Sequence, residues 1–177
     1  MCLLLLTLCY CFSSSVAFYY EDCGPRDAVV RFDDVAIEPE PLVFGEQAAV
    51  AATMRIKKQV SGGISKIEVH RLINFWGVTI PVKIPCGWGS CSKSLCRDLS
   101  VGGLPCEWIR QSNVTCGCPI GPDTIKSNDF RITVPALSSF YTMFLNGVYR
   151  IRWTWLDSSY REVGCVTADI SFASKSD

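Results

Sequence analysis

The chain has 177 residues, with 17 basic side chains, 17 acidic side chains and a formal net charge of zero. This neutrality argues against nucleic acid as a partner, because nucleic-acid-binding proteins carry a basic surface. The length fits one ordinary domain that is large enough to bury its own core.

The N-terminal segment has the features of a signal peptide. From Cys2 to Phe12 it is almost entirely apolar, and Ser15, Val16 and Ala17 then form a small-x-small cleavage site. The apolar run is shorter than the roughly 20 residues that cross a bilayer. We therefore expect residues 1–17 to be a signal peptide, residues 18–177 to form a single domain, and the protein to be exported.

The first half of this domain shows the two-residue alternation of β-strands. Strands are predicted over residues 28–38 and 48–60, and Gly62 and Gly63 are expected to form a hairpin turn after the second. Alternation continues through Ile67, Val69 and Ile73, which are expected to face inward opposite Lys66, Glu68 and His70. It resumes with Val78, Ile80 and Val82, where Pro81 indicates an edge strand or a bulge.

The middle of the chain, residues 85–121, is rich in cysteine and shows little alternation. A looped segment is expected, with one helical turn near residues 94–99.

Three of the 11 cysteines lie in the leader, and the remaining eight are suited to a framework of up to four disulfides: Cys23, Cys86, Cys91, Cys96, Cys106, Cys116, Cys118 and Cys165. A zinc site is less favoured because the usual C-x-x-C pairs are absent. Asn113 begins an N-glycosylation sequon.

The last part of the chain returns to strands, over residues 130–134, 149–155 and 162–172. Together the patterns predict an all-β sandwich or open barrel. Trp153 and Trp155 share a strand face and are suited either to the core or to an apolar cavity. A loop before them is rich in apolar residues, which either fold back onto the sandwich or touch a membrane or an apolar ligand: Leu137, Phe140, Tyr141, Met143, Phe144 and Leu145.

Catalytic patterns are weak. His70 is the only histidine and is expected on a polar strand face, and no G-x-S-x-G sequence accompanies it. Ser90 and Lys93 match S-x-x-K without the companion motifs of that enzyme class. The sequence has no phosphate-binding glycine loop, and we expect neither an enzyme nor a cofactor or metal.

Several short motifs resemble one known family. Ile84-Pro85-Cys86, Cys116-Gly117-Cys118-Pro119 and the segment 147–151, with all eight cysteines in order, resemble the ganglioside GM2 activator family of the MD-2-related lipid-recognition (ML) group. The resemblance implies an immunoglobulin-like β-sandwich opened into a β-cup with an apolar lipid cavity. It also implies the disulfide pairs Cys23–Cys165, Cys86–Cys91, Cys96–Cys118 and Cys106–Cys116.

The resemblance further implies a function. Such a protein extracts a glycosphingolipid or phospholipid from a membrane surface and presents the sugar to a lysosomal hexosaminidase-type glycosidase, and it is secreted or lysosomal. The alternatives are an accessory subunit of a receptor, with or without lipid, and more remotely a hydrolase. The residues that we predict to line the lipid cavity are Val69, Ile73, Val78, Ile80, Val82, Tyr149, Ile151, Trp153 and Trp155.

Overall fold

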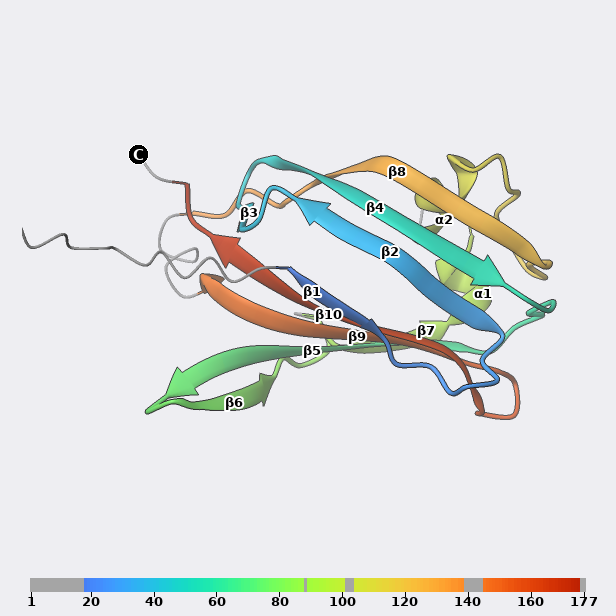
Figure 1. Ribbon diagram of the computed structural model, residues 1–177, viewed down its shortest axis with the longest axis horizontal. Coiled ribbons are helices and arrows are strands. Elements are labelled where there is room, and N and C mark those ends of the chain that lie inside the picture. Colours follow the sequence, from blue (N-terminus) through green and yellow to red (C-terminus); the bar gives the residue numbers. More distant parts are fainter. Residues whose placement is uncertain (1–17, 88, 101–103, 139–144, 176–177) are drawn as a thin grey trace, which may run out of the picture.

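The protein is a sandwich of two β-sheets, which confirms the predicted all-β fold (Figure 1). The computed structural model describes residues 18–87, 89–100, 104–138 and 145–175, so the expected signal peptide lies outside the described residues. Within these ranges no helix is long and apolar enough to cross a membrane.

The larger sheet is seven-stranded, and its main path runs in the order β1-β10-β9-β5-β6. Short β3 pairs with β10, and β7 pairs with β5. The strand β6 lies at the edge, where the proline at position 81 costs no ladder hydrogen bond. The strands are β1 (Tyr19–Asp22), β3 (Leu42–Val43), β5 (Ile64–Phe75), β6 (Val78–Lys83), β7 (Cys91–Ser94), β9 (Gly147–Leu156) and β10 (Glu162–Ala173).

The smaller sheet has three strands in the order β2-β4-β8 and packs over β9 and β10 of the larger sheet. Its strands are β2 (Val30–Glu38), β4 (Gln47–Ile56) and β8 (Asp123–Thr133). Alternation turns one side of each strand to the core, where Phe32, Met54 and Ile125 are buried. Phe32 meets Trp155 of the larger sheet edge to face, with ring centroids 6.4 Å apart, and so joins the two layers.

The glycines at positions 62 and 63 do not form the predicted hairpin. The strand before them, β4, pairs with β2 and β8, whereas the strand after them, β5, belongs to the other sheet. The chain here crosses between sheets and passes directly against β9. A Cβ atom at Gly63 would overlap the carbonyl oxygen of Leu156, and φ at Gly63 is +133°, so this crossing requires glycine.

The cysteine-rich middle contains more regular structure than predicted. The expected turn is the helix α1 (Leu95–Asp98), but β7 precedes it and a second helix, α2 (Leu104–Arg110), follows. Pro105 is tolerated because it falls in the first turn of α2. Trp108 and Ile109 are buried in the main core cluster, so this segment covers the core beside β8 (Figure 1).

Four disulfides hold these elements, and they join the pairs that the resemblance implies. Cys23–Cys165 connects the segment after β1 to β10, and Cys86–Cys91 closes the short link between β6 and β7. The other two, Cys96–Cys118 and Cys106–Cys116, tie both helices to the segment before β8. Three of the four bridges therefore stabilise the segment that carries the helices and its links to the sheets.

The crossing between the sheets gives a first prediction. Replacing Gly63 by Ala should lower the free energy of unfolding by at least about 2 kcal/mol, because the chain must move away from β9. Gly121→Ala is the control, since no atom lies within 4 Å of its added Cβ. Urea unfolding followed by fluorescence measures both, and equal midpoints for the two variants would show that β4 and β5 are not joined as described.

Candidate functional site

The residues predicted to line a cavity share one face of the larger sheet. Antiparallel pairing places Val69 opposite Ile151, and Ile73 opposite Ile80, and directly opposed residues point to the same side. We call this the inner face, because Trp153 and Trp155 on it contact Phe32 of the smaller sheet.

One end of the inner face is filled by the protein itself. Trp155 is fully buried, and the ring of Trp153 lies 5.7 Å from that of Phe32. The indole nitrogen of Trp153 donates a hydrogen bond to the hydroxyl of Ser65, at 2.9 Å. Trp155 therefore packs as core in this structure. Further along the same face, Ile151 packs against a second core cluster that includes Leu42 and Ile170, so the surface open to a ligand lies on β5 and β6.

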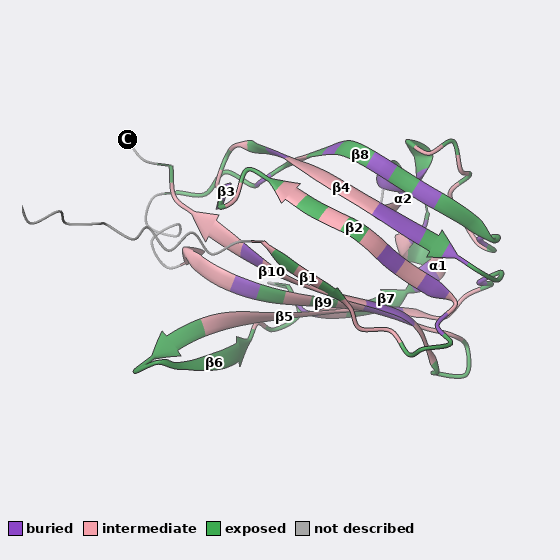
Figure 2. Cartoon of the chain, in the orientation of Figure 1, coloured by how far each residue is buried: buried purple, intermediate pink, exposed green. Residues whose placement is uncertain are grey.

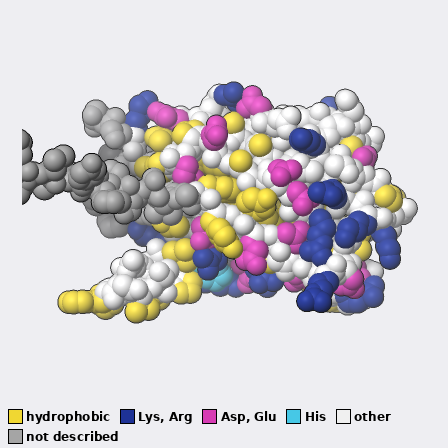
Figure 3. Space-filling model, in the orientation of Figure 1, with side chains coloured by type: hydrophobic (Ala, Val, Ile, Leu, Met, Phe, Trp, Pro, Cys, Tyr) yellow, Lys and Arg dark blue, Asp and Glu magenta, His cyan; other side chains and the backbone are white. Residues whose placement is uncertain are grey.

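The other end of the inner face continues into a projecting hairpin. The strand β5 pairs with β9 only as far as Leu72, and within the described residues its last part pairs with β6 alone. We call residues 73–82 the apolar arm. It diverges from the smaller sheet in Figure 1, it is exposed in Figure 2, and hydrophobic side chains mark it in Figure 3.

The arm exposes large apolar side chains that the sequence analysis expected to face inward. Val78 is 63% exposed, and Ile73, Ile80 and Val82 are also exposed. Alternation placed them correctly on the inner face, but no described element covers that face here. These side chains are therefore exposed, and they form an apolar surface of the kind that marks an interaction site.

The tip of the arm carries two aromatic residues that the sequence analysis missed. Phe75 is 62% exposed and Trp76 is 90% exposed. Trp76 and Gly77 both have positive φ, as a tight two-residue hairpin turn requires, and the backbone N–H of Gly77 donates to the side-chain oxygen of Asn74 at 3.1 Å. The sequence does contain a turn signal at this point. Asn74 and Gly77 flank the two aromatic residues, and a segment with alternating hydrophobicity lies on either side.

The two faces of the strands at the arm's base differ in polarity. On the outer face Glu68 lies between Lys66 and Lys83, at 3.0 Å and 3.2 Å. The hydrogen bond from Lys66, with that from Lys83, holds the pKa of Glu68 below its ordinary value. On the inner face burial raises the pKa of Tyr149, whose hydroxyl donates to the carbonyl of Leu145, so this phenol stays neutral. The outer face is solvated, whereas the inner face is apolar.

The residues of the weak catalytic patterns have structural roles. His70 lies on the outer face, as predicted, and in register between Lys83 and Arg150. The hydroxyl of Ser90 accepts a hydrogen bond from the N–H of Val69 and donates to the carbonyl of the same residue, at 2.8 and 3.2 Å. Ser90 therefore holds the edge of β5, and its oxygen is occupied by backbone groups rather than poised as a nucleophile.

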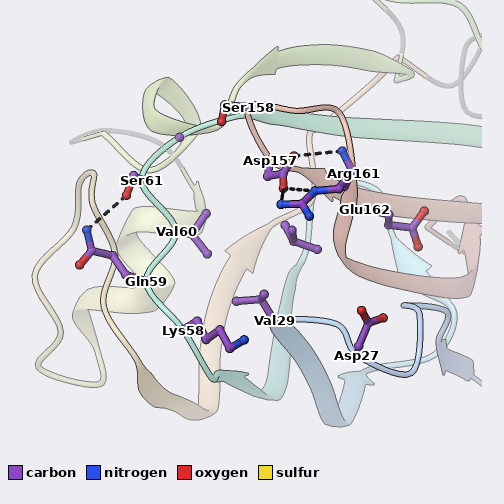
Figure 4. Close-up of a pocket in the computed structure, with 12 residues that line it drawn as sticks. Asp27, Val29, Lys58, Gln59, Val60, Ser61, Asp157, Ser158, Arg161 and Glu162 are labelled. Carbon is purple, nitrogen blue, oxygen red and sulfur yellow. Dashed lines mark hydrogen bonds and ion pairs between the residues drawn. The ribbon is translucent and has the colours of Figure 1, made fainter.

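A hollow of about 510 Å³ lies at the end of the sandwich opposite the arm (Figure 4). Charged side chains such as Asp27, Lys58 and Glu162 line it, and Asp157 pairs with Arg161 at its rim at 2.8 Å. A second hollow, of about 400 Å³, lies beside Asn113. Neither is lined by the predicted cavity residues.

The remaining predicted positions fall in loops. Leu137 is 39% exposed and Leu145 is partly buried, whereas Phe140, Tyr141, Met143 and Phe144 lie outside the described residues. Asn113 is exposed in the segment after α2. No group of three or more residues able to ligate a metal is present in the described part of the chain.

Comparison with known families matches residues 17–172 to the ML domain. The chain belongs to the ML-domain family. Members of this family bind lipids, so its most general expected property is lipid binding. The apolar inner face of this ML domain is the surface to consider for that property.

Solved structures similar to this ML domain are distant. A Niemann-Pick type C2 protein from the Japanese carpenter ant is 16% identical, with a TM-score of 0.47 over 87% of this chain and 98% of that one. The sporulation control protein Spo0M from Bacillus subtilis is 9% identical, with a TM-score of 0.38 over 83% of this chain and 50% of that one. No curated protein matches the sequence significantly.

The contrast between core and arm gives a second prediction. Trp155→Ala should lower the free energy of unfolding by about 3 to 5 kcal/mol, because it leaves a cavity between the two sheets. Trp76→Ala, the matched control at an exposed turn, should change it by less than about 0.5 kcal/mol. Urea denaturation measures both. A large loss for Trp76→Ala would mean that the arm packs against the body of the protein.

Proposed function

We propose that this ML domain binds a single lipid, a glycosphingolipid or a phospholipid, with its acyl chains against the inner face and the apolar arm. The observation that carries the proposal is that these two surfaces lie on one side of the sheet. The half-buried Val69 and Ile151 share this side with the exposed Ile73 and Ile80, and Arg71 lies between Val69 and Ile73. A ligand can thus bury the surface that the smaller sheet leaves uncovered.

The energetics of lipid transfer require such a surface. Moving an acyl chain of about 16 carbons into water costs roughly 13 kcal/mol at about 0.8 kcal/mol per CH₂ group. A carrier must replace most of the lost hydrocarbon contact with apolar surface of its own. The arm and the open part of the inner face offer aliphatic side chains for this purpose. The outer face instead carries charged side chains such as Lys66, Glu68 and Lys83.

The tip of the arm is suited to the first contact with a membrane. Phe75 and Trp76 stand at the end of a two-stranded projection, and aromatic side chains favour the interface between lipid and water. Leu137 and the apolar segment after it remain a proposed second contact. Insertion of the tip would bring the inner face next to the acyl chains that it has to accept.

The finer part of the proposal concerns the role of the bound lipid. We infer that the protein is not itself the catalyst and presents the head group to a separate soluble glycosidase of the hexosaminidase type. The occupied hydroxyl of Ser90 and the sequence motifs that resemble the activator family support this role. A receptor's accessory subunit is the alternative, since it uses the same lipid-binding surface.

The covalent structure supports a proposed site of action. Four disulfides require an oxidising compartment to form and persist. With the signal peptide proposed for residues 1–17, this supports a secreted or lysosomal protein. We further propose that the exposed Asn113 carries an N-linked glycan. Asn113 follows α2, which lies at the opposite end of the fold from β6 in Figure 1, so the glycan would not meet a membrane that the arm contacts.

Lipid uptake from vesicles tests this function. The mature protein should take up a fluorescent glycosphingolipid from phosphatidylcholine vesicles and carry it through gel filtration as a complex with one lipid per chain. The double variant Phe75→Ser/Trp76→Ser should slow uptake and weaken vesicle binding at least tenfold, because two exposed aromatic side chains contribute more than about 1.4 kcal/mol when buried in a membrane.

Tyr160→Ser provides the matched control. Tyr160 is also an exposed aromatic at a turn, but it belongs to the link between β9 and β10, which lies at the opposite end of the sandwich from the arm in Figure 1. It should bind vesicles and take up lipid like the wild type. Absence of uptake by the wild-type protein contradicts lipid binding. Equal slowing by both variants contradicts the assignment of the arm as the membrane contact. A last measurement distinguishes the two proposed roles. Stimulation of a purified hexosaminidase on the same vesicles supports the activator role, and lipid uptake without stimulation supports the accessory subunit of a receptor.

A further inference from the structure

One charged side chain interrupts the apolar inner face. Arg71 lies on β5 between Val69 and Ile73, and pairs in register with Val82 of β6 and with Tyr149 of β9. All of these neighbours are apolar or aromatic and point to the same side of the sheet. Arg71 therefore sits where the apolar arm joins the body of the sandwich.

Among the described residues, the guanidinium of Arg71 has one hydrogen-bond partner, which holds it in place. Its Nη2 donates to the backbone carbonyl of Asn146 at 2.9 Å, and the guanidinium lies close to Gly147, where an added Cβ would be 3.6 Å from Nε. The planar guanidinium has several further N–H donors that this bond leaves available. The side chain is partly buried and thus oriented, rather than extended into solvent.

No carboxylate pairs with Arg71 among the residues that the structure describes. The other Lys and Arg side chains of β5, β6 and β9 are paired: Arg150 with Asp169 at 2.7 Å, Arg152 with Glu162 at 3.5 Å, and Lys66 and Lys83 with Glu68. The adjacent chain, residues 135–149, contains no Asp or Glu in its sequence. A positive charge against an apolar surface is costly unless an anion accompanies it.

A second unpartnered polar group lies at the same place. The side-chain oxygen Oδ1 of Asn146 is buried and has no hydrogen-bond partner among the described residues, while its Nδ2 donates to Ser174 at 3.1 Å. The base of the arm thus combines a fixed cation with an unused amide oxygen, beside an apolar surface. This combination fits an amphiphile whose polar end carries both an anion and a hydrogen-bond donor.

We propose that Arg71 binds the anionic group of the lipid, a phosphate or a carboxylate, and so makes this ML domain select anionic over neutral lipids. The inference rests on the proposed function, because it assigns the polar end of the ligand whose acyl chains occupy the inner face. The guanidinium forms paired hydrogen bonds with two oxygens of the anion, a geometry for which Arg is better suited than Lys. The amide oxygen of Asn146 accepts from a hydroxyl or amide of the same head group.

Matched pairs of lipids test this selectivity. The mature protein is offered phosphatidylcholine vesicles that contain ceramide or ceramide 1-phosphate, and others that contain a sialylated glycosphingolipid or its desialylated form. Arg71→Gln should weaken uptake of the anionic member of at least one pair about tenfold or more, since a hydrogen-bonded ion pair is lost, and should leave the neutral members within about twofold. The affected pair tells phosphate from carboxylate.

Lys83→Gln is the control, because it removes the same charge from the outer face of the arm, 3.2 Å from Glu68. It should leave the ratio of anionic to neutral uptake unchanged, and Arg71→Lys should retain part of that ratio. The inference is overturned if Arg71→Gln leaves anionic uptake unaltered, lowers both members equally, or matches Lys83→Gln. If the wild type takes up neutral lipids alone, the inference fails and the proposed function stands. If it takes up none of the four lipids, the proposed function itself fails.

Discussion

The structure depends on a mismatch between its two sheets. The larger sheet is seven-stranded and apolar on its inner face, but the sheet packed against it has three strands. Where the two layers meet, Phe32, Trp153 and Trp155 fill the space between them. Beyond that contact β5 and β6 continue without a covering layer, so apolar side chains that a larger sandwich would bury remain exposed. An exposed apolar surface of this kind must be covered by a ligand, a membrane or a partner.

The two ends of the molecule therefore differ in structure. Three disulfides surround the helical segment, and α1 and α2 contribute Leu95, Trp108 and Ile109 to the core. This end is cross-linked and contains the main core cluster. The opposite end holds an uncovered hairpin with aromatic residues at its tip. A rigid base with a projecting apolar arm is a suitable arrangement for approaching a membrane while the fold stays intact.

The sequence predicted the strands and the side of the sheet on which each residue lies, but not which residues another element covers. Alternation identified the strands and placed Val69, Ile80 and Ile151 on one face, because a period of two depends only on the chain itself. It could not show that Ile80 is exposed, since exposure depends on whether another sheet lies above. The same limit applies to Gly63. A glycine indicates an unusual backbone conformation, but it does not indicate with which strand the next segment pairs. Helix α2 was missed because its seven residues are too few to display a helical period.

The central claim is that the uncovered part of the inner face holds a lipid. Native mass spectrometry of the mature protein, purified from a secreting host without detergent, tests this claim most directly. The account predicts a mass that exceeds that of the disulfide-bonded chain and any glycan by one lipid, and that returns to the chain mass after extraction with organic solvent. A protein that shows only the mass of the chain, both as purified and after incubation with lipid vesicles, would contradict it.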